Sequence, residues 1–197
     1  MSKAEKTREY IIEKAAPIFN MKGYPGTSLS DLIEATGLTK GAIYGNFDNK
    51  DEVAIAVYDY SVMMLYDRLN EGISAQQTAT GKLLAITGYY RSNWKNIYAR
   101  GGCPILNASI EADDNLPFLK KQVQSSMKNW AKQISTIIEY GQQQKEFQKG
   151  INAVDYAYTI ITLLEGGIML GKITNSQNHF MAALNRIEKI IETEIKV

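Results

Sequence analysis

The stretch TSLSDLIEATGLTKGAIYGNFDNK, residues 27–50, contains a succession of helix starts and stops that decides the fold. Ser28 can cap a helix from Leu29 to Thr36, with Asp31 three residues later as a short partner in a capping box. Gly37 then supplies the left-handed residue that ends this helix. The pattern therefore predicts a short helix with sharply defined ends.

A second short helix follows almost at once. Thr39 can cap it, and Leu38 can pack against Ile43, four residues past the cap. The connection is reduced to Gly37, Leu38 and Thr39, and a turn this short forces the two helices to cross steeply. This geometry is typical of a helix-turn-helix, whose common use is to place a helix in a DNA groove.

One further helix is predicted on each side of this pair. Asn49 can cap the next helix, with Glu52 completing the capping box. Before the pair, the spacing of apolar residues predicts a helix that ends at Gly23 and bends locally at Pro17. Its apolar stripe, on which the pair can pack, consists of Ile11, Ala15, Ile18 and Phe19.

These residues resemble the N-terminal signature of the TetR family of transcriptional regulators. The resemblance covers about a quarter of the chain without gaps, which makes it specific. It implies a homodimeric repressor whose C-terminal domain binds a small molecule and, when occupied, releases operator DNA. The residues that carry it are Phe19, Gly23, Tyr24, Thr27, Asp31, Gly37, the run from Thr39 to Tyr44, Phe47, Lys50 and Glu52.

The second short helix has one apolar face and one nearly bare face. Ile43 and Phe47 lie four residues apart and face the core, whereas the opposite face carries Gly41, Ala42 and Gly45. We expect close backbone approach to DNA, a contact of the Ala42 methyl group with a thymine, and base readout by Asn46 or Lys40. Gly45 departs from the bulkier residue often found there in the family, so side-chain readout at that position is not expected.

The resemblance also implies phosphate contacts. Tyr44 and Lys50 match family positions that hold phosphates, as do Thr27 and Ser28 at the start of the first short helix, where exposed amides favour an anion. The alternatives are partial burial for Tyr44 and a solvated helix start for Lys50. The DNA-binding set predicted is Thr27, Ser28, Thr39, Lys40, Gly41, Ala42, Tyr44, Asn46 and Lys50.

Composition favours an all-α chain of two domains, residues 1–50 for DNA binding and residues 51–197 for effector binding and dimerisation. Of 197 residues 45% are hydrophobic, which excludes disorder, and few prolines and no alternating valine-rich runs occur. The net charge is +1, and charges in residues 1–50 nearly balance, so DNA affinity should depend on positioned contacts and dimerisation. No apolar stretch of about 20 residues is apparent, so we expect a cytoplasmic protein without a membrane partner.

Apolar periodicity beyond residue 50 predicts about six helices, the first of which is the one capped by Asn49, making about nine in all. They are expected over residues 50–70, 76–98, a short segment after Pro104, 116–145, 152–173 and 176–195. The last two are predicted to form the homodimer contact, with Gly167 and Gly171 allowing close helix approach; the alternative is that their apolar stripe is an ordinary core face. The stripe expected at that contact consists of Phe180, Leu184, Ile187, Ile191 and Ile195, widened by Ala183 and Ile190.

The effector, a small molecule of unknown identity, is expected among the helices between residues 50 and 173, where aromatic and sulfur-containing side chains concentrate. Glu165 lies in an apolar run and needs a partner if buried: it is either a structural ion pair or a contact for a cationic ligand. The ligand-binding set predicted is Met63, Tyr66, Tyr90, Trp94, Tyr98, Cys103, Phe118, Trp130 and Glu165.

Cys103 provides an alternative mode of regulation. The segment from Gly101 to Asn107 resembles a Gly-Cys-x-x-x-Asn segment of a TetR-like subgroup, some members of which respond to electrophiles or oxidants. A helix start could lower the thiol pKa, although most lone cysteines are buried apolar residues. A second alternative is a helical sensor or enzyme that no longer binds DNA.

No catalytic, metal or cofactor site is predicted. His179 is the single histidine and Cys103 the single cysteine, so neither a metal set nor a Cys-His pair has support. Acidic residues such as Glu111 and Asp113 are expected to form a solvated turn. The sequence therefore predicts a regulator and not an enzyme.

Overall fold

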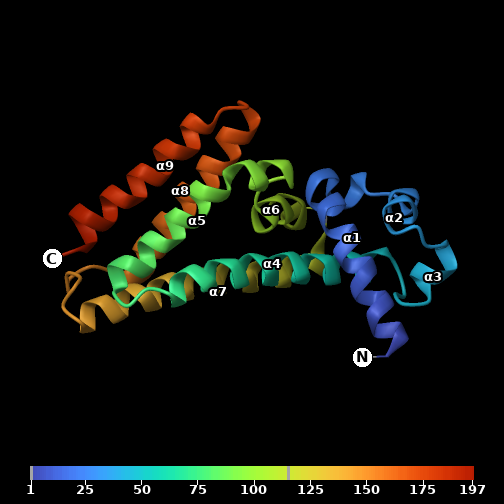
Figure 1. Cartoon of the computed structure of the whole chain (residues 1–197), viewed down its shortest axis with the longest axis horizontal. Coiled ribbons are helices and arrows are strands. Elements are labelled where there is room, and N and C mark those ends of the chain that lie inside the picture. Colours follow the sequence, from blue (N-terminus) through green and yellow to red (C-terminus); the bar gives the residue numbers. More distant parts are fainter. Residues whose placement is uncertain (1, 115) are drawn as a thin grey trace. The chain divides into compact units, whose positions relative to one another are not determined.

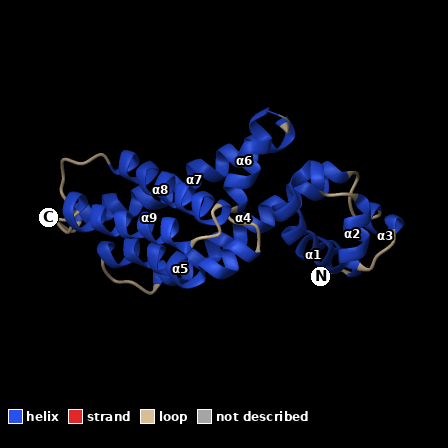
Figure 2. Cartoon of the chain, turned by 90° about the horizontal axis from the view of Figure 1, so that it is seen from above, coloured by secondary structure: helices blue, strands red, loops and turns tan. Residues whose placement is uncertain are grey.

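The structure is a computed structural model that describes residues 2–114 and 116–197. Within that part of the chain it contains nine α-helices, a terminal π-helical turn and no strand beyond one isolated bridge (Figures 1 and 2). The all-α class is confirmed, and the helix bounds agree with those predicted to within a few residues. The elements are α1 (Lys3–Gly26), α2 (Leu29–Thr36), α3 (Lys40–Tyr44), α4 (Lys50–Ser74), α5 (Ala79–Ala99), α6 (Pro104–Asp114), α7 (Pro117–Gln143), α8 (Ala153–Ile173), α9 (Gln177–Ile190) and η1 (Ile191–Ile195).

The chain divides into two compact units that do not coincide with the two domains expected from the sequence. Unit 1 comprises Met1–Met64 and Arg100–Ser125, and unit 2 comprises Leu65–Ala99 and Ser126–Val197. Unit 1 thus joins the helix-turn-helix to α6 and the first part of α7. The packing of α6 against α1, described below, accounts for this difference.

Unit 1 is built on a small apolar core between α1, α2, α3 and the start of α4. Ile11 and Ala15 of α1 belong to it, as the predicted stripe requires, and Leu32 of α2 and Ile43 of α3 pack against them with no exposed surface. Because α2 and α3 are too short to be stable alone, this packing holds them in place. The buried core set is Ile11, Ala15, Ala16, Leu32, Ile43, Phe47, Val53 and Val57.

The first helix passes through Pro17 and is interrupted at Gly23, as expected. Gly23 has φ 71° and ψ 175°, and the difference from the prediction is that a short further helical turn follows and runs to Gly26. Only glycine adopts this left-handed conformation without strain, so Gly23 breaks the helix between its two parts. The break is the place at which α6 reaches α1.

Unit 2 contains a helical core in which α9 packs on α8 and α5. Phe180, Leu184, Ile187, Ile191 and Ile195 of the predicted dimer stripe are all at most 1% exposed within the unit itself. The stripe prediction was therefore wrong, because α9 turns this face toward its own subunit. Gly167 does permit the close approach expected, since a Cβ there would lie 2.7 Å from the Cβ of Ala183 on α9.

The apolar content of α8 is that of a core helix. Contrary to the expectation that no such stretch exists, its 21 residues are long and apolar enough to span a bilayer by length and composition alone. Its buried residues, among them Ile160, Leu164 and Ile168, pack against the rest of unit 2. Burial thus accounts for part of this composition, since 44% of the apolar window is buried.

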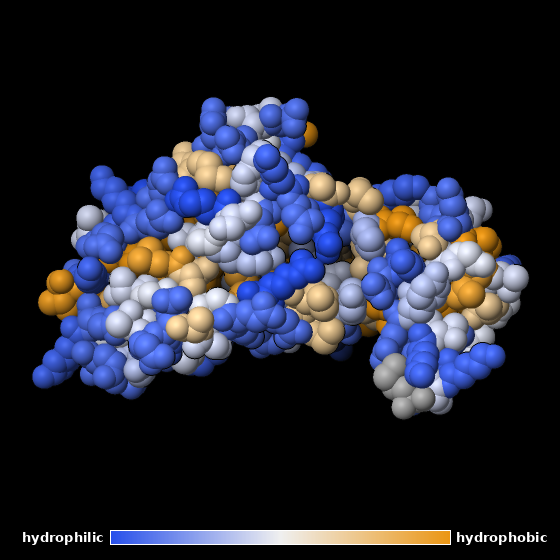
Figure 3. Space-filling model, in the orientation of Figure 1, coloured by the Kyte–Doolittle hydropathy of each residue, from blue (hydrophilic) through white to orange (hydrophobic). Residues whose placement is uncertain are grey.

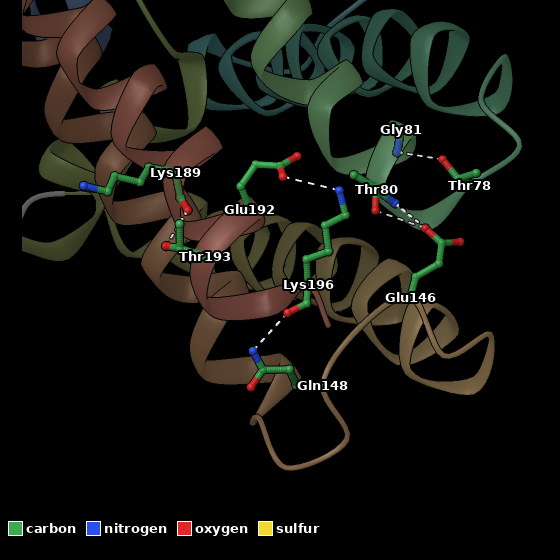
Figure 4. Close-up of polar contacts among 9 residues, drawn as sticks. All are labelled: Thr78, Thr80, Gly81, Glu146, Gln148, Lys189, Glu192, Thr193 and Lys196. Carbon is green, nitrogen blue, oxygen red and sulfur yellow. Dashed lines mark hydrogen bonds and ion pairs between the residues drawn. The ribbon is translucent and has the colours of Figure 1, made fainter.

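The Glu146 carboxylate joins the loop after α7 to the start of α5, near the C-terminus of the chain (Figure 4). Glu146, just after α7, accepts hydrogen bonds from the backbone amides of Ala79 at 2.9 Å and Thr80 at 3.0 Å, and so caps α5. These bonds hold the pKa of Glu146 below its usual value, despite the opposing effect of its desolvation. Gln148 binds the carbonyl of Lys196 at 2.9 Å, so the last residues are fastened to the same loop.

Candidate nucleic-acid interface

The ends of α2 and the start of α3 form as the capping pattern predicts. The Ser28 hydroxyl accepts from the Asp31 amide at 3.1 Å, and the Asp31 carboxylate accepts from the Ser28 amide at 2.7 Å. Gly37 ends α2 with φ 67°, and the Thr39 hydroxyl accepts from the Ala42 amide at 3.2 Å. The start of α4 is capped by Asn49, but Glu52 reaches the amide of Asp48 instead of that of Asn49.

The outer side of α3 is open to solvent. Thr39, Lys40, Gly41 and Gly45 are exposed, whereas Ile43 is fully buried on the inner side. Nothing except the Thr39 hydroxyl, at 3.9 Å, lies within 4 Å of a Cβ placed on Gly41. An exposed stretch of backbone beside one threonine and one lysine is thus available to a large partner.

Arg8 of α1 fixes the turn that follows α3. Its Nη1 donates to the carbonyl of Asn46 at 2.5 Å, and its Nη2 donates to Glu52 at 2.8 Å. The guanidinium group also lies 4.1 Å from the centre of the Phe47 ring. A planar group that satisfies three neighbours at once orients the end of α3 relative to α1 and α4.

Lys50 and Tyr24 form a second contact between α4 and α1. The Lys50 ammonium group donates to the carbonyl of Tyr24 at 2.6 Å and lies 4.1 Å from the centre of its ring. The Tyr24 hydroxyl donates to Asp51, and burial together with this bond raises the pKa of Tyr24 to about 12. Lys50 is half-buried in this arrangement, as is Tyr44.

Besides Lys50, the predicted DNA-binding residues Thr27 and Asn46 use their side chains within the chain. Thr27 is fully buried and its hydroxyl donates to the carbonyl of Gly23 at 2.7 Å, so its side chain cannot reach a phosphate. The side-chain amide of Asn46 donates to the carbonyl of Ala42 at 2.8 Å, which directs its NH₂ group back onto α3. Ser28 is exposed beside the first amides of α2, and its hydroxyl donates to the Asp31 carboxylate at 2.8 Å within the capping box.

A contact between α6 and α1 was missed by the sequence analysis. Glu111 does not lie in a solvated turn: it is a residue of α6, and its carboxylate accepts from the amide of Tyr24 at 2.8 Å. The same carboxylate covers Gly23, where any Cβ would collide with it. An amide left without a partner by the break in α1 is thereby satisfied.

The loop before α6 is fastened to the same helix. The side-chain amide of Asn107 donates to the backbone carbonyl of Asn20 at 3.0 Å and to the carbonyl of Gly101 at 2.9 Å. Gly101 has φ 96°, and a Cβ there would lie 2.6 Å from the Asn20 carbonyl oxygen. No local pattern predicts the contact with Asn20, because Asn20 and Asn107 are 87 residues apart in the chain.

Comparison with known proteins identifies the family. The model described as "Bacterial regulatory proteins, tetR family" matches residues 11–57, and the model described as "Tetracyclin repressor-like, C-terminal domain" matches residues 79–187. Together they cover most of the chain. The chain belongs to the TetR family of transcriptional regulators.

Several relatives extend this similarity over most or part of the chain. A TetR-family transcriptional regulator from Cytophaga hutchinsonii is 40% identical, with a TM-score of 0.95 over 100% of this chain and 98% of that one. An uncharacterized HTH-type transcriptional regulator of Lactococcus lactis is 28% identical over 87% of this chain and 86% of its own length. IcaR of Staphylococcus aureus, named as a negative transcriptional regulator of the biofilm operon icaADBC, is 34% identical over 36% of each chain.

The effector residues predicted for this TetR-family chain are divided between the two units. Met63, Cys103 and Phe118 belong to unit 1, and the other six belong to unit 2. Within unit 2, Trp94 and Tyr98 of α5 lie with ring centres 5.5 Å apart, and Tyr90 and Tyr98 each lie 6.1 Å from Phe180 of α9. Three predicted residues thus share one aromatic cluster.

The remaining predicted effector residues have different environments. Trp130 is 1% exposed, which is the burial of a core residue, and the Tyr66 hydroxyl donates to the carbonyl of Ser126 at 2.7 Å. Met63 is 50% exposed, and Glu165 is buried in α8. The Phe118 ring lies edge-on against that of Tyr24, 5.4 Å between centres.

Cys103 lies directly before α6 and is 3% exposed. Its carbonyl accepts from the amide of Asn107 at 3.1 Å, in the first turn of the helix. Among residues 2–114 and 116–197, no group of three or more His, Cys, Asp or Glu side chains is placed to hold a metal ion.

Proposed function

We propose that this chain is a dimeric repressor that binds a roughly palindromic operator and is released from it by a small molecule. One observation carries the DNA-binding part: the outer side of α3 is bare and exposed while Ile43 and Arg8 fix its inner side and its end. A rigidly held helix with an open backbone surface suits insertion into a major groove.

The proposed contacts fall into two classes. Gly41 and Ala42 allow close approach to base edges, and Lys40 and Thr39 lie at the exposed start of the same helix. Ser28, at the start of α2, and Tyr44, at the end of α3, are the proposed phosphate contacts, and the exposure of Ser28 supports its part. Lys50 and Asn46 would contact DNA by giving up the internal hydrogen bonds of their side chains. Thr27 would act only by supporting the turn before Ser28.

A homodimer through α8 and α9 would supply the two-fold symmetry. Although the α9 stripe is internal, α8 exposes an apolar face at helical spacing: Tyr158 is 45%, Met169 49%, Leu170 46% and Ile173 79% exposed. Gly166, with nothing within 4 Å of its Cβ position, lies between them along this face. Figure 3 shows that apolar residues reach a largely hydrophilic surface in separate patches. The alignment of several exposed apolar residues along one helix therefore supports an interface there.

Repression and ligand release are supported by similarity. The relative IcaR is named as a negative regulator, although the match covers only 36% of it. The aromatic cluster around Phe180 gives unit 2 the side chains of an apolar effector site, and Glu165→Gln would test whether that carboxylate takes part. Because operator DNA is the proposed partner, the protein would act in the cytoplasm.

An electrophoretic shift with DNA from beside the protein's own gene, repeated at two salt concentrations, tests the function. We expect a shift that is lost with unrelated DNA and in a Gly41→Glu variant, since that side chain would stand on the bare surface of α3. Gly88→Glu, an exposed glycine of α5, is the matched control. A shift that is absent or independent of sequence would instead favour a helical sensor without a DNA site.

Regulation through Cys103 is the second candidate. Its position before the first turn of α6 supports it, whereas its burial restricts access to reagents. If operator binding by a Cys103→Ser variant responds to an electrophile as it does in the parent, regulation through Cys103 is excluded.

A further inference from the structure

Unit 1 contains a cavity that lies outside both the predicted effector set and the DNA-binding surface. Its volume is about 50 Å³, and it is lined by residues of α1, α4, α6 and α7, all within this unit. In this measure one water takes roughly 10–15 Å³, so the cavity has room for a few waters or for a compact ligand of similar size. None of the nine predicted effector residues lines it.

The lining has the chemistry of a site for a small cation. Glu111 is the one residue with a formal charge among those described in the lining, and the other side chains there are apolar, aromatic or neutral. The aromatic residues in the lining are Phe19 and Tyr24 of α1 and Tyr58 of α4. A carboxylate beside aromatic rings favours an ammonium group with a short apolar body.

Glu111 also connects this cavity to the DNA-binding helices. Its Oε2 accepts from the amide of Tyr24 at 2.8 Å, immediately after the break at Gly23. Tyr24 begins the short turn that leads to Thr27 and to the cap of α2 at Ser28. A cation that draws the carboxylate into the cavity would weaken the bond to Tyr24 and loosen the approach to α2.

We propose that this cavity binds a small primary ammonium ion, with Glu111 as its counter-ion, and that occupancy lowers operator affinity through the Glu111–Tyr24 contact. The coupling to DNA rests on the function proposed above, but the site itself does not. A ligand of this size is expected to bind with a dissociation constant on the order of millimolar.

Nuclear magnetic resonance of the full chain provides a direct test, because the Tyr24 amide reports on its bond to Glu111. Propylammonium, 1-propanol and propionate serve as cationic, neutral and anionic probes of similar size. We expect a saturable shift of the Tyr24 resonance with propylammonium only. An equal response to 1-propanol, or no saturable response to propylammonium, would overturn the proposal.

Three variants separate the site from general effects. Glu111→Gln keeps an acceptor for the Tyr24 amide but removes the charge, and it should weaken propylammonium binding about tenfold or more. Asp113→Asn makes the same change on an exposed residue of the same helix and should bind as the parent does. Ala108→Leu fills the cavity without removing a hydrogen bond of α6 to α1. If Glu111→Gln melts at a lower temperature than the parent, loss of propylammonium binding in Ala108→Leu is the result that tests the site.

The operator assay then tests the coupling. Propylammonium should weaken operator binding by the parent about fivefold or more, at the low end of ordinary coupling between sites, and should not do so for Ala108→Leu. If operator affinity is unchanged while propylammonium occupies the cavity, the coupling is overturned. Operator binding in the absence of amine depends only on the repressor function, so the two proposals fail separately.

Discussion

The guanidinium group of Arg8 donates to the carbonyl of Asn46 at 2.5 Å and so joins the N-terminal part of α1 to the turn that ends α3. Asn46 follows the C-cap of a helix only five residues long, which has few contacts of its own. The orientation of the bare surface of α3 is therefore set in part by a residue that does not lie on it.

Arg8→Ala should reduce both stability and operator affinity. The lost bonds to Asn46 and Glu52 involve a charged donor that is 37% exposed, so we expect a loss of about 1 kcal/mol in the free energy of unfolding. Arg8→Lys retains the charge but cannot satisfy both partners and the Phe47 ring, so it should be intermediate. Thermal melting and a gel shift measure the two effects, and parental operator affinity in Arg8→Ala would contradict the role.

Gly41→Glu should leave the fold intact while abolishing specific DNA binding. The Cβ position is open and the residue is exposed, so only the modest helix propensity of the site changes. A carboxylate there would oppose the phosphates of an approaching duplex. Circular dichroism and fluorescence anisotropy with labelled operator distinguish folding from binding, with Gly88→Glu compared in parallel.

The capping box of α2 should make stability depend on acid pH. Hydrogen bonds from Lys22 and from Ser28 hold the pKa of Asp31 well below its usual value of 3.8. Because the folded pKa is the lower one, this contribution is present above about pH 4 and is lost as the pH falls further. Asp31→Asn should melt below the parent at pH 7, and the difference should shrink below pH 4. A gap that stays constant with pH would show that the charge of Asp31 is not involved.

Gly141→Ala should destabilise unit 2 by about 1–3 kcal/mol. A Cβ at this position would collide with the ring of Phe147, which is fully buried and cannot move aside. Gly88→Ala adds the same methyl group to an open position of α5 and should stabilise by up to about 1 kcal/mol. Denaturant unfolding of both variants measures the contrast, and equal effects would show that the Phe147 contact is not tight.

Ile173→Glu should dissociate the proposed dimer. Its side chain is 79% exposed at the end of the apolar face of α8, where a charge would be buried by a partner copy. Ile110→Glu makes the same change on α6, at a residue 65% exposed, and should leave the assembly unchanged. Sedimentation velocity gives the mass of each, and an Ile173→Glu dimer as stable as that of the parent would place the interface elsewhere.

Local signals in the sequence predicted the helix ends well. Ser28, Thr39 and Asn49 each cap the helix expected of them, because a cap needs only a side chain and an amide two or three residues away. The outward face of α3 followed from the same reasoning, since Ile43 and Phe47 fix which side is buried. Membership of the TetR family followed from these residues as well.

Contacts between distant residues were not predictable in this way. Glu111 and Tyr24 are 87 residues apart, and nothing near Glu111 distinguishes it from a solvated carboxylate. The α9 stripe was assigned to a partner because periodicity shows that a face is apolar but not what covers it. Thr27 was assigned to DNA by family position, whereas its burial depends on how α1 ends.

The cap that Glu146 places on α5 has a consequence for the order in which unit 2 folds. The carboxylate and the amides that it holds are 66 and 67 residues apart, so the first turn of α5 gains its partner only after α7 has come into place. The first turn of α5 should therefore acquire protection from amide hydrogen exchange late in refolding, after the middle of the same helix.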